Sequence, residues 1–461
     1  MSQKQTNAPA ELRQTLDNFS LREYNTNKNL ENFGEADMTN ILEQTARSIS
    51  ESIRFDSSLS RATSKPPFGK GAADCLAHFL SLARSFGFET HNYDNYAGEV
   101  VFGEGPEEFA VLAHLDVVPA GNGWTKEPFG GEISEGKIWG RGAIDDKGPV
   151  MCVLYALKAL KDEGFVPRKK IKFIVGCNEE NGWACIEHYN QVATMPDEGF
   201  SPDGSFPVIY AEKGILHVRL HFPMGEKPPF FFLEGGSGPN MVCDECSATP
   251  RTLTLTKARE LGLEIRNKKI IAHGKSAHGS TPELGENAIL PILKFFEGKS
   301  DQVKFIIDCL FNDRFRLTEL EDETGKLTLS PDMIKYRKGE VQVICDIRYP
   351  ATLPLSAVTE RLERIGVKYE TIRHQPPLLQ DKNGVLVQTL LKTYEACTGE
   401  QATPVAIGGG TYARALKNGV AFGPEMEGDE PVMHQADEYI TIERVKLLLD
   451  VYQKAIRELT K

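Results

Sequence analysis

Acidic and imidazole side chains follow several apolar runs of the sequence. Glu179 and Glu180 come after the run Ile-Lys-Phe-Ile-Val-Gly, His114 ends another apolar segment, and a pair of aspartates begins at Asp145. Anions gathered at one place repel one another, and a divalent cation is the simplest way for a fold to tolerate them. The pattern therefore predicts a metal-dependent hydrolase.

His114 and Asp116 lie two residues apart at the end of an expected strand, Ala110-Val-Leu-Ala. Alternation along a strand directs both side chains to the same side of the chain. One residue could bind a metal while the other orients it, because a ligating imidazole usually has its second N–H held by a carboxylate. The alternative is a strand-end pair that only caps a loop.

Asp145 follows the tight turn Gly140-Arg-Gly142 and precedes an expected helix that opens at Gly148-Pro149. A carboxylate there is stabilised by the helix dipole, so an ordinary helix cap is the alternative to a metal ligand. The adjacent glutamates at 179 and 180 are harder to explain in structural terms. Neighbouring side chains point in different directions, so one could bind metal while the other moves protons.

Asp203 and His434 gain meaning only from the other candidates. Asp203 stands in the turn-like segment Phe-Ser-Pro-Asp-Gly, and His434 is a lone histidine in Val-Met-His-Gln-Ala-Asp-Glu. Each alone is more typical of a structural residue. Together the candidates form a mixed nitrogen and oxygen donor set that suits zinc and can accept manganese or cobalt. The set is His114, Asp145, Glu180, Asp203 and His434.

Hydrophobic periodicity predicts an α/β fold with two domains. Short apolar runs such as Phe109 to Leu112 and Ile171 to Val175 are typical of strands buried on both faces of a sheet. After about residue 214 the pattern changes to alternating strands and short helices, which predicts an inserted α+β layer. The expected organisation is an amino-terminal extension without an assigned role, a catalytic domain, the inserted domain, and the rest of the catalytic domain. The corresponding ranges are 1–38, 39–213, 214–381 and 382–461.

Length and composition narrow the class of protein. A chain of 461 residues with 40% hydrophobic and 26% charged residues predicts a globular protein of two or three domains. Its net charge of -12 disfavours nucleic acid as a partner. The amino terminus lacks the apolar core of a secretion signal, and no apolar run has the ~20 residues of a membrane span. With nine scattered cysteines, which fit reduced thiols, these features predict a cytoplasmic protein without membrane association.

Several separated motifs, in a characteristic order, resemble the M20 metallopeptidase family and, within it, the PepV-type dipeptidase branch. The resemblance runs from about residue 40 to the end of the chain. The segments that carry it are His114-Leu-Asp-Val-Val-Pro-Ala-Gly, Gly-Arg-Gly-Ala-Ile-Asp145-Asp-Lys-Gly-Pro, Asn178-Glu-Glu-Asn-Gly-Trp, Phe-Ser-Pro-Asp203 and Met-His434-Gln-Ala-Asp-Glu.

The resemblance implies two divalent metal ions per chain, zinc in the first instance. By similarity Asp145 bridges both ions, His114 and Asp203 complete one site, and Glu180 and His434 complete the other. Glu179 would be the general base and Asp116 would orient His114. The family also has a cis peptide bond after the bridging aspartate, here between Asp145 and Asp146.

The inserted domain of this branch acts as a lid that contributes to the active site. By similarity His278 in Gly-Lys-Ser-Ala-His-Gly stabilises the oxyanion with Asn240 nearby, and Arg348 in Asp-Ile-Arg-Tyr-Pro receives the substrate carboxylate. The alternatives are a buried histidine, a turn asparagine, and an edge-strand arginine paired with Asp346.

The sequence therefore predicts a monomeric dipeptidase that acts on small peptides through a metal-activated water. An M20-type amidohydrolase or carboxypeptidase acting on N-acyl amino acids is an alternative, because the metal ligands are shared. The long inserted segment favours the dipeptidase. A catalytically silent metal- or peptide-binding protein is the alternative of another class, and Glu179 beside a complete ligand set argues against it.

Overall fold

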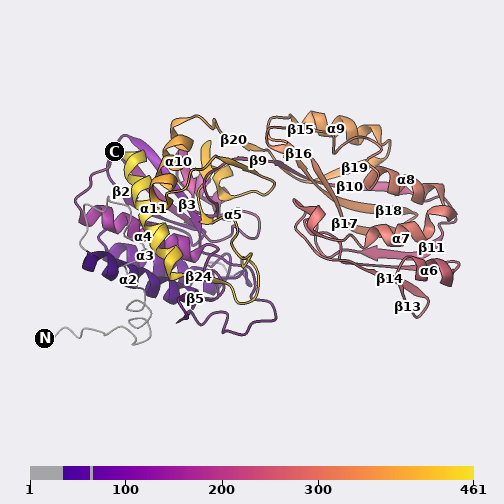
Figure 1. Ribbon diagram of the computed structural model, residues 1–461, viewed down its shortest axis with the longest axis horizontal. Coiled ribbons are helices and arrows are strands. Elements are labelled where there is room, and N and C mark those ends of the chain that lie inside the picture. Colours follow the sequence, from indigo (N-terminus) through magenta and orange to yellow (C-terminus); the bar gives the residue numbers. More distant parts are fainter. Residues whose placement is uncertain (1–34, 63–65) are drawn as a thin grey trace. The chain divides into compact units, whose positions relative to one another are not determined.

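The computed structural model describes residues 35–62 and 66–461, and the chain divides into two compact units (Figure 1). The second unit comprises Ala211–Leu379 and Ala406–Gly410, and the first comprises the rest of the described chain. Most of the expected extension, residues 1–34, lies outside the described residues. Helix α2 (Glu35–Ile53) begins the description.

The first unit is built on a mixed sheet in the strand order β1-β2-β6-β3-β7-β22-β9. Strands β6, β3, β7 and β22 run parallel, whereas β1, β2 and β9 pair antiparallel with their neighbours. The apolar runs that predicted two strands form β3 and β6, and both strands are buried over their last six residues. The bounds are β1 Glu89–Tyr93, β2 Ala97–Phe102, β3 Glu107–His114, β6 Lys169–Gly176, β7 Glu198–Ser201, β9 Ile209–Glu212 and β22 Asn418–Ala421.

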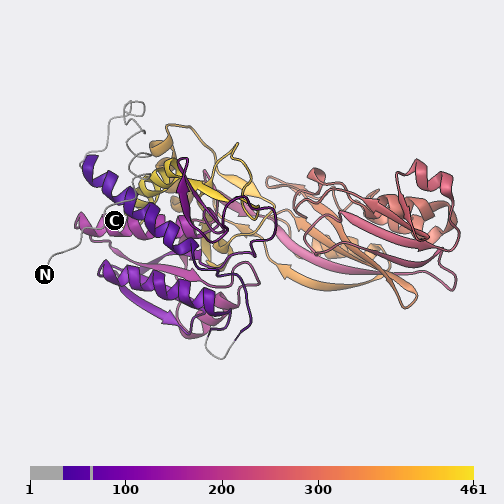
Figure 2. The same ribbon diagram turned by 90° about the horizontal axis from the view of Figure 1, so that it is seen from below.

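Helices cover this sheet. Helix α4 packs against α11, α2 and β3, while α3 and α5 contact β1 and β2 (Figures 1 and 2). The buried residues of α4 include Met151, Cys152 and Tyr155 as well as Val150, Val153 and Leu154. Neighbours on several sides of the helix explain why it is apolar around most of its circumference. The bounds are α3 Lys70–Ser85, α4 Lys147–Asp162, α5 Ala184–Val192, α10 Val385–Thr398 and α11 Ile442–Thr460.

A small three-stranded sheet joins distant parts of the first unit. It contains β4 (Glu132–Ser134), β5 (Lys137–Trp139) and β24 (Tyr439–Thr441) in the order β24-β5-β4. Strands β5 and β24 run antiparallel, with Trp139 opposite Tyr439. The pairing holds the segment after β5 beside the segment before β24.

The second unit is an antiparallel sheet with helices packed on one face (Figures 1 and 2). Its strand order is β13-β14-β12-β11-β17-β18-β10-β19. Alternate residues of β10, from Leu216 to Phe222, enter a hydrophobic core that α7, α8 and α9 complete. The strand bounds are β10 Gly214–Pro223, β11 Phe230–Gly235, β12 Glu245–Pro250, β13 Glu264–Arg266, β14 Lys269–His273, β17 Thr328–Arg337, β18 Glu340–Tyr349 and β19 Lys368–Gln375. The helix bounds are α6 Leu255–Glu260, α7 Ile289–Phe296, α8 Asp301–Leu310 and α9 Leu355–Arg364.

The predicted fold class, a mixed-sheet α/β domain with an α+β domain inserted into it, is confirmed by this architecture. Among the described helices, none combines the length and the apolar character needed to cross a bilayer.

A buried aspartate in the second unit predicts a pH-dependent stability. Asp332 is fully buried, its Oδ1 accepts a hydrogen bond from Ser330, and its Oδ2 has no hydrogen-bond partner among the described residues. The pKa of Asp332 is raised to about 7, chiefly by burial; the hydrogen bond from Ser330 and the charge of Arg348 oppose the shift, and the charge of Asp346 adds to it. A raised carboxyl pKa favours the folded state below the unfolded pKa, near 4, and this contribution is lost as the pH rises through the folded pKa.

We therefore expect Asp332→Asn to stabilise the protein at pH 8, by about 1–3 kcal/mol, and to give little advantage at pH 5. Thermal unfolding of the variant and the wild type at both pH values measures the difference. Asp244→Asn, at an exposed position in the same unit, is the control. An equal effect of Asp332→Asn at both pH values would contradict the assignment.

Candidate active site

The candidate ligands come from strands whose carboxyl ends meet at one edge of the first sheet. His114 is the last residue of β3, Glu180 follows the end of the parallel strand β6, and Asp203 follows the end of β7. In open α/β sheets this edge is where ligands bind. The parallel pairing therefore explains why residues nearly ninety positions apart in sequence come together.

Asp145 lies between two imidazoles. Its Oδ1 is 3.0 Å from His114 Nε2, and its Oδ2 is 2.9 Å from His434 Nε2. Asp203 Oδ2 lies 3.6 Å from the same His114 nitrogen, and Glu180 Oε1 lies 3.0 Å from His434 Nε2. The five predicted ligands thus form two halves that share one carboxylate. The peptide bond between Asp145 and the next residue is cis, which confirms that prediction.

Asp116 contacts this group in a way that differs from the sequence-based expectation. His114 Nδ1 donates to the backbone carbonyl of Asp116 at 2.9 Å, and the carboxylate Oδ1 is farther away, at 3.6 Å. The Asp116 carboxylate instead accepts the backbone N–H groups of Glu179 and Glu180, at 2.9 and 3.1 Å. Asp116 therefore orients the imidazole through its main chain and holds the paired glutamates through its side chain.

Electrostatic shifts follow from this crowding. Burial alone would lower the pKa of His114, but its hydrogen bonds to Asp116 and Asp145 raise it well above the usual range. Burial would raise the pKa of Asp145, but the hydrogen bonds from the two imidazoles lower it. Burial, and then the charge of Asp145, raise the pKa of Asp203 to about 7 and raise the pKa of Glu180. The carboxylates of the cluster thus require positive charge beside them.

The residues present fit a divalent metal centre. Ligand atoms of His114, Asp145 and Glu180 all lie within 4.8 Å of one another. His114 Nδ1 donates to the backbone carbonyl of Asp116, so Nε2 is the ring nitrogen left for a metal. Ligating histidines usually have their second ring N–H held by an acceptor in this way. A set of two imidazoles and three carboxylates suits zinc, and also manganese or cobalt.

Glu179 stands beside this group but makes different contacts. Its Oε1 accepts the indole N–H of Trp183 at 3.0 Å. The Trp183 ring packs edge-on against Tyr412, and Tyr412 packs in the same way against His114. Trp183 directly precedes helix α5 and has a left-handed backbone conformation, with φ of 71°. Glu179 is therefore held separately from the five ligands.

Asn240 and His278 lie next to each other in the second unit. Residues Met241 and His278 form an antiparallel bridge, and Gly279 N donates to Asn240 O at 2.8 Å. Both predicted residues are exposed. The backbone N–H of Ser280 donates to His278 Nδ1, so the neutral ring carries its hydrogen on Nε2.

Arg348 is buried, at 3% exposure, and pairs with Asp346. Its Nε and Nη2 donate to the two carboxylate oxygens at 2.7 and 2.8 Å, and its Nη1 donates to the carbonyl of Gly408 at 3.0 Å. The ion pair with Asp346, which was the alternative to a carboxylate clamp, is therefore present. These three hydrogen bonds leave one N–H on each of Nη1 and Nη2, because a guanidinium has five in all.

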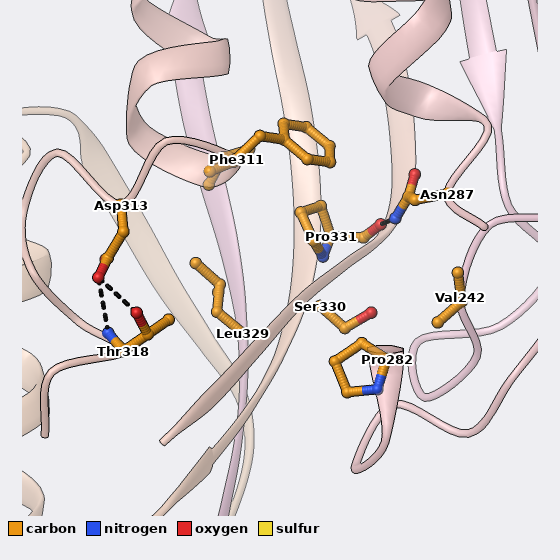
Figure 3. A pocket seen from close by; sticks show the side chains of 10 residues that line it. Val242, Pro282, Asn287, Phe311, Asp313, Thr318, Leu329, Ser330 and Pro331 are labelled. Carbon is orange, nitrogen blue, oxygen red and sulfur yellow. Dashed lines mark hydrogen bonds between the residues drawn. The ribbon is translucent and has the colours of Figure 1, made fainter. Parts of the chain in front are cut away.

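The second unit also contains a pocket of about 290 Å³ (Figure 3). Its polar side chains already have partners: Asn287 Nδ2 donates to Pro331 O, and Asp313 accepts from Thr318. None of its lining residues is a predicted site residue, so it is not the candidate active site. The lining residues are Val242, Pro282, Asn287, Leu310, Phe311, Asp313, Thr318, Leu329, Ser330 and Pro331.

Sequence reasoning missed three residues that contact the site residues or their partners without being candidate ligands. Trp183 donates to Glu179, and Glu438 accepts hydrogen bonds from Asp145 N and from Arg141. Trp183 and Glu438 stand inside motifs that were singled out, but nothing in a local pattern shows which atoms they contact. Arg141, between two turn glycines, was read only as part of the turn. These contacts depend on pairing between distant segments.

A two-domain α/β fold with imidazoles and carboxylates gathered at the carboxyl edge of its sheet is typical of a metal-dependent hydrolase. A sequence model of Peptidase family M20/M25/M40 matches residues 110–458. A Lactobacillus delbrueckii subsp. lactis protein named Beta-Ala-Xaa dipeptidase is 35% identical over 451 residues, which is 90% of this chain and 96% of that protein. The chain therefore belongs to the M20 peptidase family.

Solved structures share the fold at low sequence identity. Human carnosine dipeptidase 1 aligns with a TM-score of 0.55 at 14% identity, covering 92% of this chain and 98% of that one. An M20 family metallo-carboxypeptidase from Sulfolobus solfataricus aligns with a TM-score of 0.55 at 15% identity, over 90% and 98% of the two chains. Because these neighbours carry different activities in their names, the fold alone does not select the substrate.

Proposed function

We propose that this peptidase is a dinuclear metal-dependent dipeptidase. The observation that carries the proposal is Asp145, whose two carboxylate oxygens each face a different imidazole, at 3.0 and 2.9 Å. One carboxylate placed in this way can bridge two ions. His114 and Asp203 would hold one ion, and Glu180 and His434 the other. The 35% identity to a protein named Beta-Ala-Xaa dipeptidase supports the substrate class.

Two divalent ions bound here, zinc or alternatively manganese or cobalt, would supply a nucleophilic water near neutral pH and polarise the peptide carbonyl. Glu179 acts as the general base. Trp183 holds its Oε1, so the proton of the attacking water goes to Oε2. The same carboxyl group then returns the proton to the nitrogen of the leaving amine. The Asp116 carboxylate keeps Glu179 in place by accepting a hydrogen bond from the backbone N–H of Glu179.

In the same proposal, His278 stabilises the oxyanion through Nε2, with Asn240 beside it. Its tautomer is set by the Ser280 backbone. We expect His278→Ala to lower kcat about 10²- to 10³-fold, as for a typical oxyanion donor, with metal content unchanged. Elemental analysis and steady-state kinetics on a dipeptide measure both quantities, and His273→Ala, at an exposed position in β14, is the control. Loss of metal from His278→Ala would show that the histidine has another role.

Arg348 receives the substrate carboxylate with the two remaining N–H groups of its guanidinium, while Asp346 fixes the plane of that group. We expect Arg348→Lys to raise KM for dipeptides with a free carboxylate by about 10- to 100-fold, because hydrogen bonds to charged groups contribute about 1.5–3 kcal/mol. Lysine keeps a positive charge beside Asp346 and so limits destabilisation. Amide-capped dipeptides are the control substrates. An equal rise in KM for both substrates would contradict the clamp.

A hydrolysis panel tests the function as a whole. Dipeptides, tripeptides and N-acyl amino acids are assayed with zinc, manganese and cobalt. Turnover restricted to dipeptides supports the proposal, whereas turnover of N-acyl amino acids favours the amidohydrolase or carboxypeptidase alternative. The proposal further includes a cytoplasmic location and a monomeric state, and sedimentation analysis of the full chain measures the oligomeric state.

A further inference from the structure

A single buried carboxylate joins the two segments that carry Asp145 and His434. The pairing of β5 with β24 places the chain that leaves β5 beside the chain that enters β24. The first segment leads to Asp145, and the second begins at His434. Gly140 N continues the pairing by donating to the backbone carbonyl of Glu438 at 2.8 Å.

The Glu438 side chain reaches across to the Asp145 segment. Its Oε1 accepts the backbone N–H groups of Gly142 and Ile144, both at 3.0 Å, and that of Asp145 at 3.3 Å. Its Oε2 accepts a hydrogen bond from Arg141 Nη1 at 2.6 Å. Glu438 is 0% exposed and Arg141 is 2% exposed. The carboxylate thus has donors on both oxygens in a water-excluded place.

These contacts make the backbone of the Asp145 segment depend on one distant side chain. Ile144 and Asp145 are residues of a turn rather than of a helix or strand. A buried backbone N–H without an acceptor is costly, so removal of Glu438 Oε1 would force this segment to rearrange. Asp437, which precedes Glu438, holds the segment that begins at His434. Its carboxylate accepts hydrogen bonds from the backbone N–H groups of Thr125 and Lys126, at 2.8 and 3.1 Å.

We propose that Glu438 is a positioning residue of the metal centre. By accepting the N–H groups of the Asp145 segment, it sets the position of Asp145 relative to His434 and so sets the affinity for metal. The inference rests on the proposed dinuclear site. The competing explanation is that Glu438 serves only as the partner of Arg141 in a buried ion pair.

Two double variants separate these explanations. Glu438→Gln/Arg141→Met and Glu438→Leu/Arg141→Met both lack the ion pair, but only the glutamine variant keeps an oxygen that can accept the three N–H groups. Replacing a buried pair by apolar side chains of similar size is often tolerated, so the leucine variant has a reasonable basis for folding. Thermal unfolding in EDTA verifies that each variant is folded.

The first readout is Co²⁺ affinity, which is monitored through the visible absorption of the bound ion. The second is hydrogen exchange of residues 140–145 in EDTA, measured by mass spectrometry, which does not depend on metal. We expect the glutamine variant to bind Co²⁺ within about threefold of the wild type, and the leucine variant to bind about 10- to 100-fold more weakly. Exchange in residues 140–145 should be faster in the leucine variant alone.

Equal Co²⁺ affinity of the two variants, whether both are weakened or both are unchanged, would overturn the proposal, because the acceptor oxygen would then have no separate effect. If the leucine variant does not fold, Glu438→Asp takes its place: it keeps a charge beside Arg141 but draws the oxygens back from the N–H groups. Wild-type Co²⁺ affinity in that variant would also overturn the proposal. Failure of the wild-type protein to bind Co²⁺ would contradict the proposed function itself, and the inference with it.

Discussion

Glu179→Gln is expected to lower kcat by about 10²- to 10⁴-fold, the range that a positioned general base contributes. The substitution keeps the size of the side chain and an oxygen that can accept the indole N–H of Trp183. It removes only the capacity to take a proton from water. Because Glu179 is not among the five proposed ligands, metal content should stay at the wild-type value.

Steady-state kinetics and elemental analysis on the same preparation measure this prediction. Glu187→Gln, at an exposed position in the nearby helix α5, is the matched control and should leave kcat unchanged. Turnover within a few-fold of the wild type after Glu179→Gln would remove the residue from the role of base. Loss of metal would instead mean that Glu179 is a ligand.

Asp145→Asn is expected to abolish metal binding in both halves of the proposed site and to lower activity by about 10³-fold or more. This factor corresponds to the several kcal/mol of transition-state stabilisation that a metal ion typically contributes. An amide at this position offers one neutral oxygen in place of the two charged oxygens that face His114 and His434. The two imidazoles would then share no anionic partner. In the proposed site, both ions would depend on this one carboxylate.

Asp203→Asn provides the matched comparison, because Asp203 lies near His114 and belongs to only one half of the proposed site. After dialysis, the Asp203 variant should retain about one ion per chain and the Asp145 variant close to none. Elemental analysis distinguishes the two. Two ions retained by Asp145→Asn would rule out a bridging role.

Much of the fold was predictable because its signals are local. Apolar runs predicted β3 and β6, and Gly148-Pro149 predicted the start of α4, all of which are present with shifts of a few residues. The burial of α4 on several sides was not predictable. Burial on more than one side depends on which elements pack around a helix, and a single segment does not contain that information.

The contacts that the Asp116 and Arg348 side chains make were not predictable from local sequence patterns. The sequence placed Asp116 near His114, but whether its carboxylate or its carbonyl meets the ring depends on the loop that follows β6. Similarly, both a substrate clamp and a pair with Asp346 were open for Arg348, and only the strand geometry shows that the pair exists.

The amino-acid sequence indicates which donors stand at which strand ends, because it contains the residue types and the end of each apolar run marks where a strand stops. How those donors face one another depends on the tertiary structure. Asp145 meets His434, and Glu438 meets the segment before Asp145, only because β5 and β24 pair across about 300 residues. Such contacts depend on the packing of the whole chain, so no local pattern records them.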